Sequence, residues 1–395
     1  GVDPKGEMWK LPAEHVGFYA EQDARLTLML WQRFKSEIYT QSLGTIWDLE
    51  KSLLPILIEM RKQGIRVDTE KCSNLQGSFK KQEKDTLQKI KKLVGQDIDI
   101  WAARQIGFAF DKLGIDYPRT AKTDEPSFTQ SWLNNNPNEI SKLIVQAREI
   151  NKFHNTFLNS IMKYEHNGRI HAEIRQIKND FGGTVSGRLS MSNPNLQQLP
   201  ARSKEFGPMV RSLFLPENGC QWGSFDYSQQ EPRLVVHYAS SIGEGYAGSQ
   251  ELVEAYANAD ADFHQTVADL IGIERKQAKT IGLGLMYGMG KNKLGTMLGV
   301  NPDEAHDLIN KYNSKAPFVK ALSDRCMQKA SSEGVIRTKL GRKCRFDMWE
   351  PKDFGIHTAE RFDNASAKYG AQNIKRAFTY KALNRLIQGS AADQT

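Results

Sequence analysis

One stretch of the sequence places chemically different side chains at every fourth position. It reads Arg275-Lys-Gln-Ala-Lys-Thr-Ile-Gly-Leu-Gly-Leu-Met-Tyr-Gly288, with Arg275, Lys279, Leu283 and Tyr287 at the repeating positions. On an α-helix each step of four advances by about 40°, so these side chains form one oblique stripe. Two cations, an apolar side chain and an aromatic ring on one face suit a nucleoside triphosphate lying along the helix. An amphipathic surface helix with solvated cations has the same spacing, so the stripe alone leaves both interpretations open.

The composition is that of a folded globular protein. The chain has 395 residues, of which 39% are apolar and 25% are charged, so it has room for about two or three domains. A formal net charge of +8 permits a polyanionic partner but is weak support for one. The four cysteines are far apart and lack the spacing of a zinc site, so we expect reduced, structural thiols. No window approaches about 18 consecutive apolar residues, so no membrane span is expected.

Both ends of the sequence look like cuts in a longer chain. The first residue is Gly1 rather than Met, and residues 387–395 stop inside a predicted helix. We therefore expect that a targeting signal of the parent protein would lie outside this sequence.

A second informative stretch is Gln221-Trp-Gly-Ser-Phe-Asp-Tyr-Ser-Gln-Gln-Glu-Pro-Arg233. It predicts a strand ending at Phe225, with Asp226 at the carboxyl edge and a helix shortly after. A carboxylate at a strand end is well placed to hold a divalent metal, and the following helix N-terminus attracts phosphates. Ser228 and Glu231 also fit the S-x-x-E capping box, which would give them a purely structural role.

The first half of the chain is predicted to be largely helical. In the helical run 15–31, Tyr19 and Asp23 share a face, as in a metal-dependent hydrolytic site or an ordinary surface pair. A helix over 46–61 should end at Gly64, before an extended segment. Residues 80–92 have few apolar positions, so they predict a helix that projects into solvent.

The pattern changes after Gly168. Residues 169–177 alternate as a half-buried strand. They precede a loop over 182–200 that is rich in hydrogen-bonding side chains and includes Arg188. Such a loop can read the acceptors that every base pair presents in the minor groove.

Two of these stretches together resemble a known family. The segment from Asp226 to Arg233 and the stripe from Arg275 to Gly288 are similar to motifs A and B of family A DNA polymerases, the DNA polymerase I family. The sequence Gln229-Gln-Glu-Pro232 within the first motif resembles that of a bacteriophage member of the family.

The resemblance covers the rest of the chain. Tyr19-Ala-Glu-Gln-Asp23 resembles the third motif of the 3′–5′ exonuclease. Gly187-Arg-Leu-Ser, with Asn193-Pro-Asn-Leu-Gln-Gln, resembles the primer–template loop. Asn384-x-x-x-Gln388-Gly-x-Ala-Ala-Asp393 resembles the palm helix that faces the template.

The resemblance implies an α+β, mostly helical, right-hand polymerase fold with thumb, palm and fingers, and with the C-terminal end of a 3′–5′ exonuclease domain. The implied segments are 1–40 for the exonuclease helices, 41–165 for the thumb and 166–231 for the first part of the palm. Residues 232–374 would form the fingers, and 375–395 would return to the palm.

The implied reaction is template-directed DNA synthesis, in which a primer 3′-hydroxyl attacks the α-phosphate of a dNTP and pyrophosphate leaves. Two Mg²⁺ ions would stabilise the attacking and leaving oxygens. By this resemblance Asp226 holds both metals, while Arg275 and Lys279 neutralise the triphosphate. In the exonuclease, Asp23 would be the metal ligand, with Tyr19 beside it.

The resemblance also implies contacts with the substrates. Leu283 would contact the sugar and base, and Tyr287 would stack near the templating base. Glu231 would lie under the ribose and exclude a 2′-hydroxyl, and His264 would contact a phosphate. The residues implied to touch DNA are Arg188, Asn193, Asn384 and Gln388.

The implied partners are primer–template DNA, dNTPs and a processivity factor, with no membrane. The protein would act as a monomer in the cytoplasm, that of the host cell for a phage protein. Two alternatives remain open: a single-subunit RNA polymerase, which carries a similar fingers helix, and a non-catalytic DNA-binding relative. Glu231 and the exonuclease-like helix favour DNA synthesis over the first, and Asp226, Arg275 and Lys279 favour catalysis over the second.

Two departures from the family pattern have consequences. The family usually has an aromatic residue where Leu283 stands, so we expect altered discrimination of the sugar. The family's His-Asp-Glu motif, which carries the second metal-binding carboxylate, would lie beyond Thr395. We therefore expect this 395-residue chain to be inactive by itself.

Overall fold

The protein is described here from a computed structural model, which covers residues 6–120, 123–180, 182–200, 203–242, 246–257, 262–353, 355 and 357–395. The chain is α+β and mostly helical. It divides into two compact units. Unit 1 comprises Gly1–Pro55, Gln176–Leu189 and Phe225–Thr395, and unit 2 comprises Ile56–Arg175 and Ser190–Ser224. Within the described ranges, no helix is both long enough and apolar enough to cross a membrane.

Unit 2 consists of helices and short antiparallel strands. Helix α2 (Gly44–Gln63) enters it from unit 1. The other helices are α3 (Thr69–Val94), α4 (Ala103–Lys112), α5 (Gln130–Asn135), α6 (Glu139–Lys152), the π-helical turn η2 (Phe153–Leu158), α7 (Asn159–Tyr164), η3 (Leu196–Gln198) and α8 (Phe206–Arg211). The strands are β1 (Ile65–Val67), β2 (Glu165–His166), β3 (Arg169–Ile170), β4 (Glu173–Arg175), β5 (Ser190–Ser192) and β6 (Phe214–Leu215). One sheet has the order β2-β3-β1-β6, and β4 pairs with β5.

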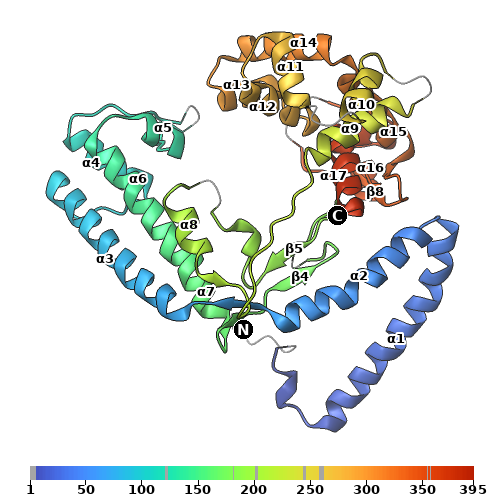
Figure 1. Cartoon of the computed structure of the whole chain (residues 1–395), viewed down its shortest axis with the longest axis horizontal. Helices are drawn as coiled ribbons and strands as arrows, with labels where there is room; N and C mark the ends of the chain where they lie inside the picture. Colours follow the sequence, from blue (N-terminus) through green and yellow to red (C-terminus); the bar gives the residue numbers. More distant parts are fainter. Residues whose placement is uncertain are drawn as a thin grey trace. The chain divides into compact units, whose positions relative to one another are not determined.

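Helix α3 corrects one prediction. Residues 80–92 were expected to project into solvent, but α3 lies beside α6 and buries Phe79, Ile90 and Val94 (Figure 1). Cys72, Phe79 and Thr86 recur at intervals of seven, so a narrow stripe reaches the core although the helix is polar overall. The helix begins after Asp68, whose carboxylate accepts from the amide of Lys71.

The strand predicted over 169–177 is two separate strands. β3 pairs with β1 and β2, whereas β4 pairs with β5 in the register Ile174↔Met191. The chain therefore changes partners between β3 and β4. Sequence alternation is the same on both sides of such a change, because it reports burial and not the identity of the neighbouring strand.

Unit 1 contains the helices that carry most of the predicted site. They are η1 (Met8–Lys10), α1 (Ala13–Thr40), α9 (Gln230–Ser240), α10 (Ser249–Ala257), α11 (Phe263–Ile271), α12 (Arg275–Met286), α13 (Lys291–Leu298), α14 (Pro302–Lys315), α15 (Pro317–Glu333), α16 (Phe362–Tyr369), η4 (Ala371–Asn373), η5 (Thr379–Lys381) and α17 (Ala382–Gln394). The strands are β7 (Val335–Arg337), β8 (Lys343–Arg345), β9 (Met348–Pro351), β10 (Glu360–Arg361) and β11 (Ile374–Arg376). β7 pairs with β8, and β10-β9-β11 form a second sheet.

One hydrophobic core joins α9, α12 and α17, which carry most of the predicted site residues of unit 1. Helices α11 to α14 lie together in one group (Figure 1). Ile281 of α12, Val235 of α9 and Leu383 of α17 belong to the same cluster of buried side chains. The positions of the predicted site residues on these three helices are therefore coupled by packing.

The strand predicted to end at Phe225 is not formed. Residues 221–227 belong to no strand, and all of them are exposed. A strand is stabilised by the ladder of hydrogen bonds to a neighbour, and no described segment pairs with these residues. The prediction of a helix shortly after Asp226 is confirmed, because α9 begins at Gln230.

Candidate nucleotide-binding site

The predicted stripe lies on the exposed side of α12. Ala278 and Ile281 are buried on its other side, while Arg275 and Lys279 are exposed. Leu283 is half-buried, and Tyr287 directly follows the last helical residue. The helical spacing inferred from the sequence is thus confirmed. Both cations are accessible to a ligand from solvent.

A capped neighbouring helix holds Arg275. The carboxylate of Asp262 accepts from the amides of His264 (3.0 Å) and Gln265 (3.1 Å) at the start of α11. Its other oxygen accepts from Nε of Arg275 at 2.6 Å. Burial opposes ionisation here, but the hydrogen bond from Arg275 prevails and lowers the pKa of the Asp262 carboxyl.

Lys279 differs from Arg275 in its partners. Arg275 shares its charge with Asp262, whereas Lys279 has no ion pair with any described residue. The net positive charge of the stripe therefore comes mainly from Lys279. Sequence reasoning missed Asp262, although an Asp just before a helical run is a recognisable N-cap signal.

His264 is a neutral, buried side chain. It is 4% exposed, and burial lowers its pKa to about 4, with Lys279 and Arg275 adding to the effect and Asp262 opposing it. Its Nδ1 atom has no hydrogen-bond partner among the described residues. At neutral pH the ring can donate or accept a hydrogen bond, but it brings no positive charge to a phosphate.

Glu231 pairs with Arg188, which is a contact that sequence reasoning did not predict. The two side chains form an ion pair, with Glu231 18% exposed. The capping-box alternative is wrong, because the N-cap of α9 is Gln229, without a side-chain cap. The carboxylate predicted to lie under the ribose and the cation predicted to touch the duplex are therefore neighbours.

A side-chain hydrogen bond joins the end of α12 to α17. The Gln388 amide donates to the Tyr287 hydroxyl at 2.8 Å. Asn384 lies one turn before Gln388 on α17 and is half-buried. A residue predicted to lie near the templating base thus contacts a residue predicted to touch the duplex.

A buried charge cluster supports the loop that carries Arg188. The Arg342 guanidinium donates to Asp393 of α17 (2.5 Å) and to Glu50 of α2 (2.6 Å). Gly187 has a φ of +86°, and a Cβ there would lie 2.7 Å from this guanidinium, so only glycine allows the loop so close. Burial is outweighed by these hydrogen bonds, which raise the pKa of Arg342. The cluster therefore ties the loop to α2 and α17.

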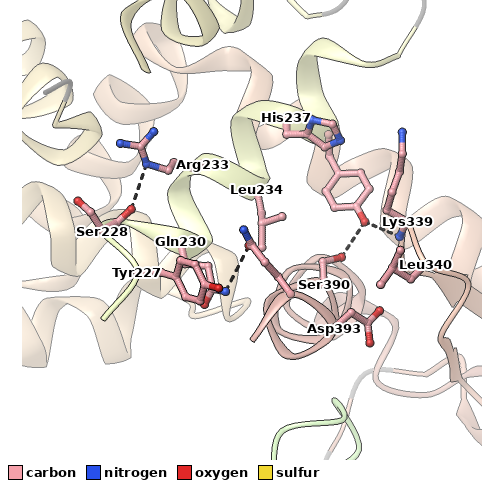
Figure 2. A pocket seen from close by; sticks show the side chains of 12 residues that line it. Tyr227, Ser228, Gln230, Arg233, Leu234, His237, Lys339, Leu340, Ser390 and Asp393 are labelled. Atoms are coloured by element: carbon pink, nitrogen blue, oxygen red, sulfur yellow. Dashed lines mark hydrogen bonds between the residues drawn. The ribbon is translucent and has the colours of Figure 1, made fainter. Parts of the chain in front are cut away.

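A cavity of about 450 Å³ lies beside α9 and α17 (Figure 2). On its wall the hydroxyls of Tyr238 and Ser390 are hydrogen-bonded at 2.7 Å, and the Gln230 amide donates to the side-chain oxygen of Gln394 at 3.3 Å. Arg275 and Lys279 do not line it. The cavity is therefore separate from the stripe of α12, although Tyr227, next to Asp226, forms part of its wall.

Asp226 stands in the exposed segment before α9. The described part of the chain contains no group of three or more His, Cys, Asp or Glu side chains that could hold a metal. One carboxylate is present, but the described residues do not complete a metal site around it. Asp23 and Tyr19 likewise lie on the exposed helix α1, where no residue is buried.

The predicted DNA contacts are divided between the two units. Arg188, Asn384 and Gln388 belong to unit 1, whereas Asn193 belongs to unit 2. Within unit 2, the Asn193 side chain accepts from the hydroxyl of Tyr164 at 3.0 Å. The structure therefore gives Asn193 a partner in its own unit.

The chain belongs to DNA polymerase family A, because the model of that family matches residues 69–395. It is 36% identical to a DNA-directed DNA polymerase of Pseudomonas phage M6, in a match that covers 100% of this chain and 63% of that protein. It is 30% identical to DNA polymerase DpoZ of Acinetobacter phage SH-Ab 15497, over 97% of this chain and 63% of that protein.

A solved structure resembles the fold. It is the POL domain of Pol1 from M. smegmatis in complex with DNA primer-template and dNTP, with a TM-score of 0.67 and 25% identity. The match covers 87% of this chain and 57% of that one. The predicted family, the similarity to phage enzymes and the mostly helical α+β class are thus confirmed. The chain spans 63% of the length of the two phage relatives.

Proposed function

We propose that this chain carries the nucleotide- and duplex-binding part of a DNA-directed DNA polymerase. The reaction is addition of a nucleotide from a dNTP to a primer 3′-hydroxyl, directed by a template. The observation that carries the proposal is the exposed stripe of α12, in a chain of family A whose relatives are named DNA-directed DNA polymerases. The solved complex with DNA primer-template and dNTP supports both substrate classes.

The stripe would bind the triphosphate and the nucleoside along the helix. Lys279, which has no ion pair among the described residues, would meet the phosphates first, and Arg275 would be held toward them by Asp262. Fixed cations that neutralise a transferring phosphoryl group need little reorganisation during reaction, which lowers the barrier. Leu283 offers a half-buried apolar surface to the sugar and base, and Tyr287 offers a ring next to α17.

Glu231 would select the sugar and Arg188 would contact the duplex beside it. Their ion pair fixes the carboxylate, so that it fills the space that a 2′-hydroxyl would need. Asn384 and Gln388 on α17, and Asn193 in unit 2, would contact the duplex through acceptors common to all base pairs. A neutral His264 would donate one hydrogen bond to a phosphate oxygen.

The family implies a metal cofactor, and we assign one ligand for Mg²⁺ to Asp226. A Mg²⁺ site also needs further oxygen ligands. The described residues form no group of three acidic, His or Cys side chains that would complete it. The described residues therefore do not fit a full two-metal site. We accordingly propose that this 395-residue chain binds its substrates but does not polymerise by itself.

Helix α1 is proposed to be the last helix of a 3′–5′ exonuclease domain, with Asp23 as its metal ligand and Tyr19 beside it. Two observations support this assignment. The two residues share one face of α1 at a spacing of four. The helix also exposes large apolar side chains, such as Phe18 (76%) and Leu28 (57%), as expected of a helix that packs against further structure.

Binding of dNTP to the complex of this chain with a chain-terminated primer–template tests the proposal. We expect the next correct dNTP to tighten the complex, measured by fluorescence anisotropy. Lys279→Ala should weaken dNTP binding about 10-fold or more, because a hydrogen bond to a charged group contributes about 1.5–3 kcal/mol. Affinity for DNA alone should stay within about 2-fold.

Lys276→Ala is the matched control, because Lys276 is exposed on the same helix but lies off the stripe. It should change dNTP binding by less than about 2-fold. A complex insensitive to every dNTP would contradict the proposal. Equally tight binding of ribonucleotides would favour an RNA polymerase, and primer extension by the chain alone would contradict its assignment as inactive.

A further inference from the structure

The two faces of the β7–β8 hairpin differ sharply in chemistry. Ile336 pairs with Cys344, and both side chains are buried. Alternate residues of a strand face opposite sides. The other face therefore carries Arg337, Lys343 and Arg345, which we call the cationic face. Arg345 is exposed, and the other two are half-buried.

The cationic face places like charges directly opposite each other. Arg337 of β7 and Lys343 of β8 are cross-strand partners, and Arg345 lies two residues after Lys343 on β8. Like charges at directly paired positions destabilise a sheet, so the hairpin alone gives no reason for this arrangement. The pKa of Lys343 is lowered by desolvation and by the two neighbouring guanidinium groups.

The protein partner of this face is a neutral amide. Oε1 of Gln41, at the end of α1, accepts from Lys343 Nζ and Arg345 Nη2, each at 2.8 Å. Its backbone carbonyl accepts from Arg337 at 2.9 Å.

The cationic face keeps an excess of positive charge. The one carboxylate that acts on Lys343, that of Glu37, is bound to the Gln41 amide nitrogen at 2.7 Å. The C-terminus of α1 adds about half a negative charge. Three cations therefore face one carboxylate and a helix end. None of the three forms an ion pair with a described carboxylate, so an external anion would meet charges that no described carboxylate neutralises directly.

We propose that the cationic face binds the phosphate backbone of a single nucleic-acid strand. Cations at paired and alternate positions of a hairpin are about 5–7 Å apart, so they can meet several phosphates of one strand at once. A free phosphate or nucleotide would occupy only part of the face. Contacts to phosphate from Lys and Arg position a strand without reading its sequence.

The position of the hairpin identifies the strand. Arg385 of α17 donates to the backbone carbonyl of Arg345 at 2.6 Å, and the Cys344 thiol on the opposite, buried face contacts the Arg385 carbonyl, so the hairpin that carries the cationic face packs against α17. Arg385 follows Asn384 and is one turn from Gln388 on the same helix. The inference rests on the proposed function, in which these two residues touch the duplex. The strand on the cationic face is then the unpaired template beyond that duplex.

Two DNA probes with the same duplex test this site, one blunt and one with a single-stranded 5′ template extension. Their affinities for the full chain are measured by anisotropy over a range of salt. The wild-type chain should bind the extended probe more tightly. The combined variant Arg337→Gln, Lys343→Gln, Arg345→Gln should lose about 10-fold or more on that probe, and the salt slope should fall by about 2, as for three lost single-strand contacts. Binding of the blunt probe should stay within about 2-fold.

Two further variants separate the site from general charge and from folding. Lys293→Gln, Lys311→Gln, Lys315→Gln removes the same charge from exposed positions of α13 and α14 and should affect both probes equally. Gln41→Glu keeps all three cations but gives them a carboxylate partner. It should therefore fold normally, as checked by thermal unfolding, and still weaken binding of the extended probe.

Each outcome decides the inference. Equal loss of affinity for both probes in the Arg337→Gln, Lys343→Gln, Arg345→Gln variant would overturn the inference while leaving the proposed function intact. Unchanged binding of the extended probe by Gln41→Glu would do the same. A wild-type chain that binds neither probe would overturn the proposed function as well. A loss of affinity for the extended probe alone, in the triple variant of the cationic face and in Gln41→Glu, would establish the site.

Discussion

Helix α12 and the segment around Asp226 both carry predicted site residues of unit 1, but they differ in how they are held. On α12, the exposed cations stand on a helix whose other side is buried in the shared core with Ile281. Asp226 lies in a segment that belongs to no strand, and its neighbour Phe225 is 98% exposed. The helix that carries the proposed nucleotide-binding side chains is thus fixed by packing, whereas the segment that carries the proposed metal ligand is not.

This difference separates the part of the proposed site that would bind the nucleotide from the part that would hold the metal for the reaction. A triphosphate site needs cations on a rigid surface, and α12 provides them through its own packing and through Asp262. A metal site needs several ligands at fixed distances, and the described residues contain no group of three potential ligands that includes Asp226. The two halves of the proposed reaction therefore depend on different parts of the structure, and three experiments can test the contrast.

The largest expected effect comes from truncating one side chain in each region. Ile281→Ala should lower the free energy of unfolding by about 2–5 kcal/mol, because it leaves a cavity in the core. Phe225→Ala should change it by less than about 0.5 kcal/mol, because the ring makes little buried contact. Urea unfolding measures both. Comparable losses in the two variants would show that the segment at Asp226 is packed after all.

The pH dependence of stability tests the burial of His264. The pKa of this group is lowered to about 4 in the folded chain from 6.5. The contribution of His264 to the free energy of unfolding is thus fully present above pH 6.5 and is lost as the pH falls toward 4. In this range His264 binds a proton in the unfolded chain but not in the folded chain. The loss should reach about 3 kcal/mol, and His264→Gln should remove that part of the profile.

His306→Gln is the control for this measurement, because His306 is exposed on α14. Its profile should match that of the wild-type chain. An unchanged profile in His264→Gln would mean that His264 is solvated and able to meet phosphate as a cation.

The smallest expected effect concerns the contact of α12 with α14. A Cβ at Gly282 would lie 2.8 Å from the hydroxyl of Tyr312, which is buried and has no hydrogen-bond partner among the described residues. Gly282→Ala should therefore destabilise the chain by about 1–3 kcal/mol through overpacking. Tyr312→Phe removes the obstructing hydroxyl, so the double variant should recover about 1 kcal/mol or more of that loss.

Thermal unfolding of the two single variants and the double variant measures this coupling. Gly290→Ala is the control, because a Cβ there meets no atom within 4 Å. Strict additivity of Gly282→Ala and Tyr312→Phe would show that α12 and α14 do not meet at this point.

The sequence predicted those features that depend on local spacing. The spacing of four residues from Arg275 to Tyr287 correctly predicted a helix with an exposed stripe, because helical periodicity is a property of neighbouring residues. The helix after Asp226 was also predicted correctly. The strand ending at Phe225 was not, because a strand exists only with a partner, and its composition does not report whether a partner is present.

The sequence did not predict the contacts between distant segments. Glu231 was expected either to cap its own helix or to lie under a ribose, but its partner in the folded chain is Arg188. The like-charged pair of Arg337 and Lys343 is equally invisible in sequence, because the strand register decides which residues face each other.

By itself the sequence determined the class of the protein and the helix that carries the stripe. Only the tertiary structure decided which of those charges are already paired, that His264 is neutral, and that three cations share one face of a hairpin. The physical reason is that helix periodicity depends on residues close in the chain. Charge pairing, burial and pKa depend on which segments the fold brings together.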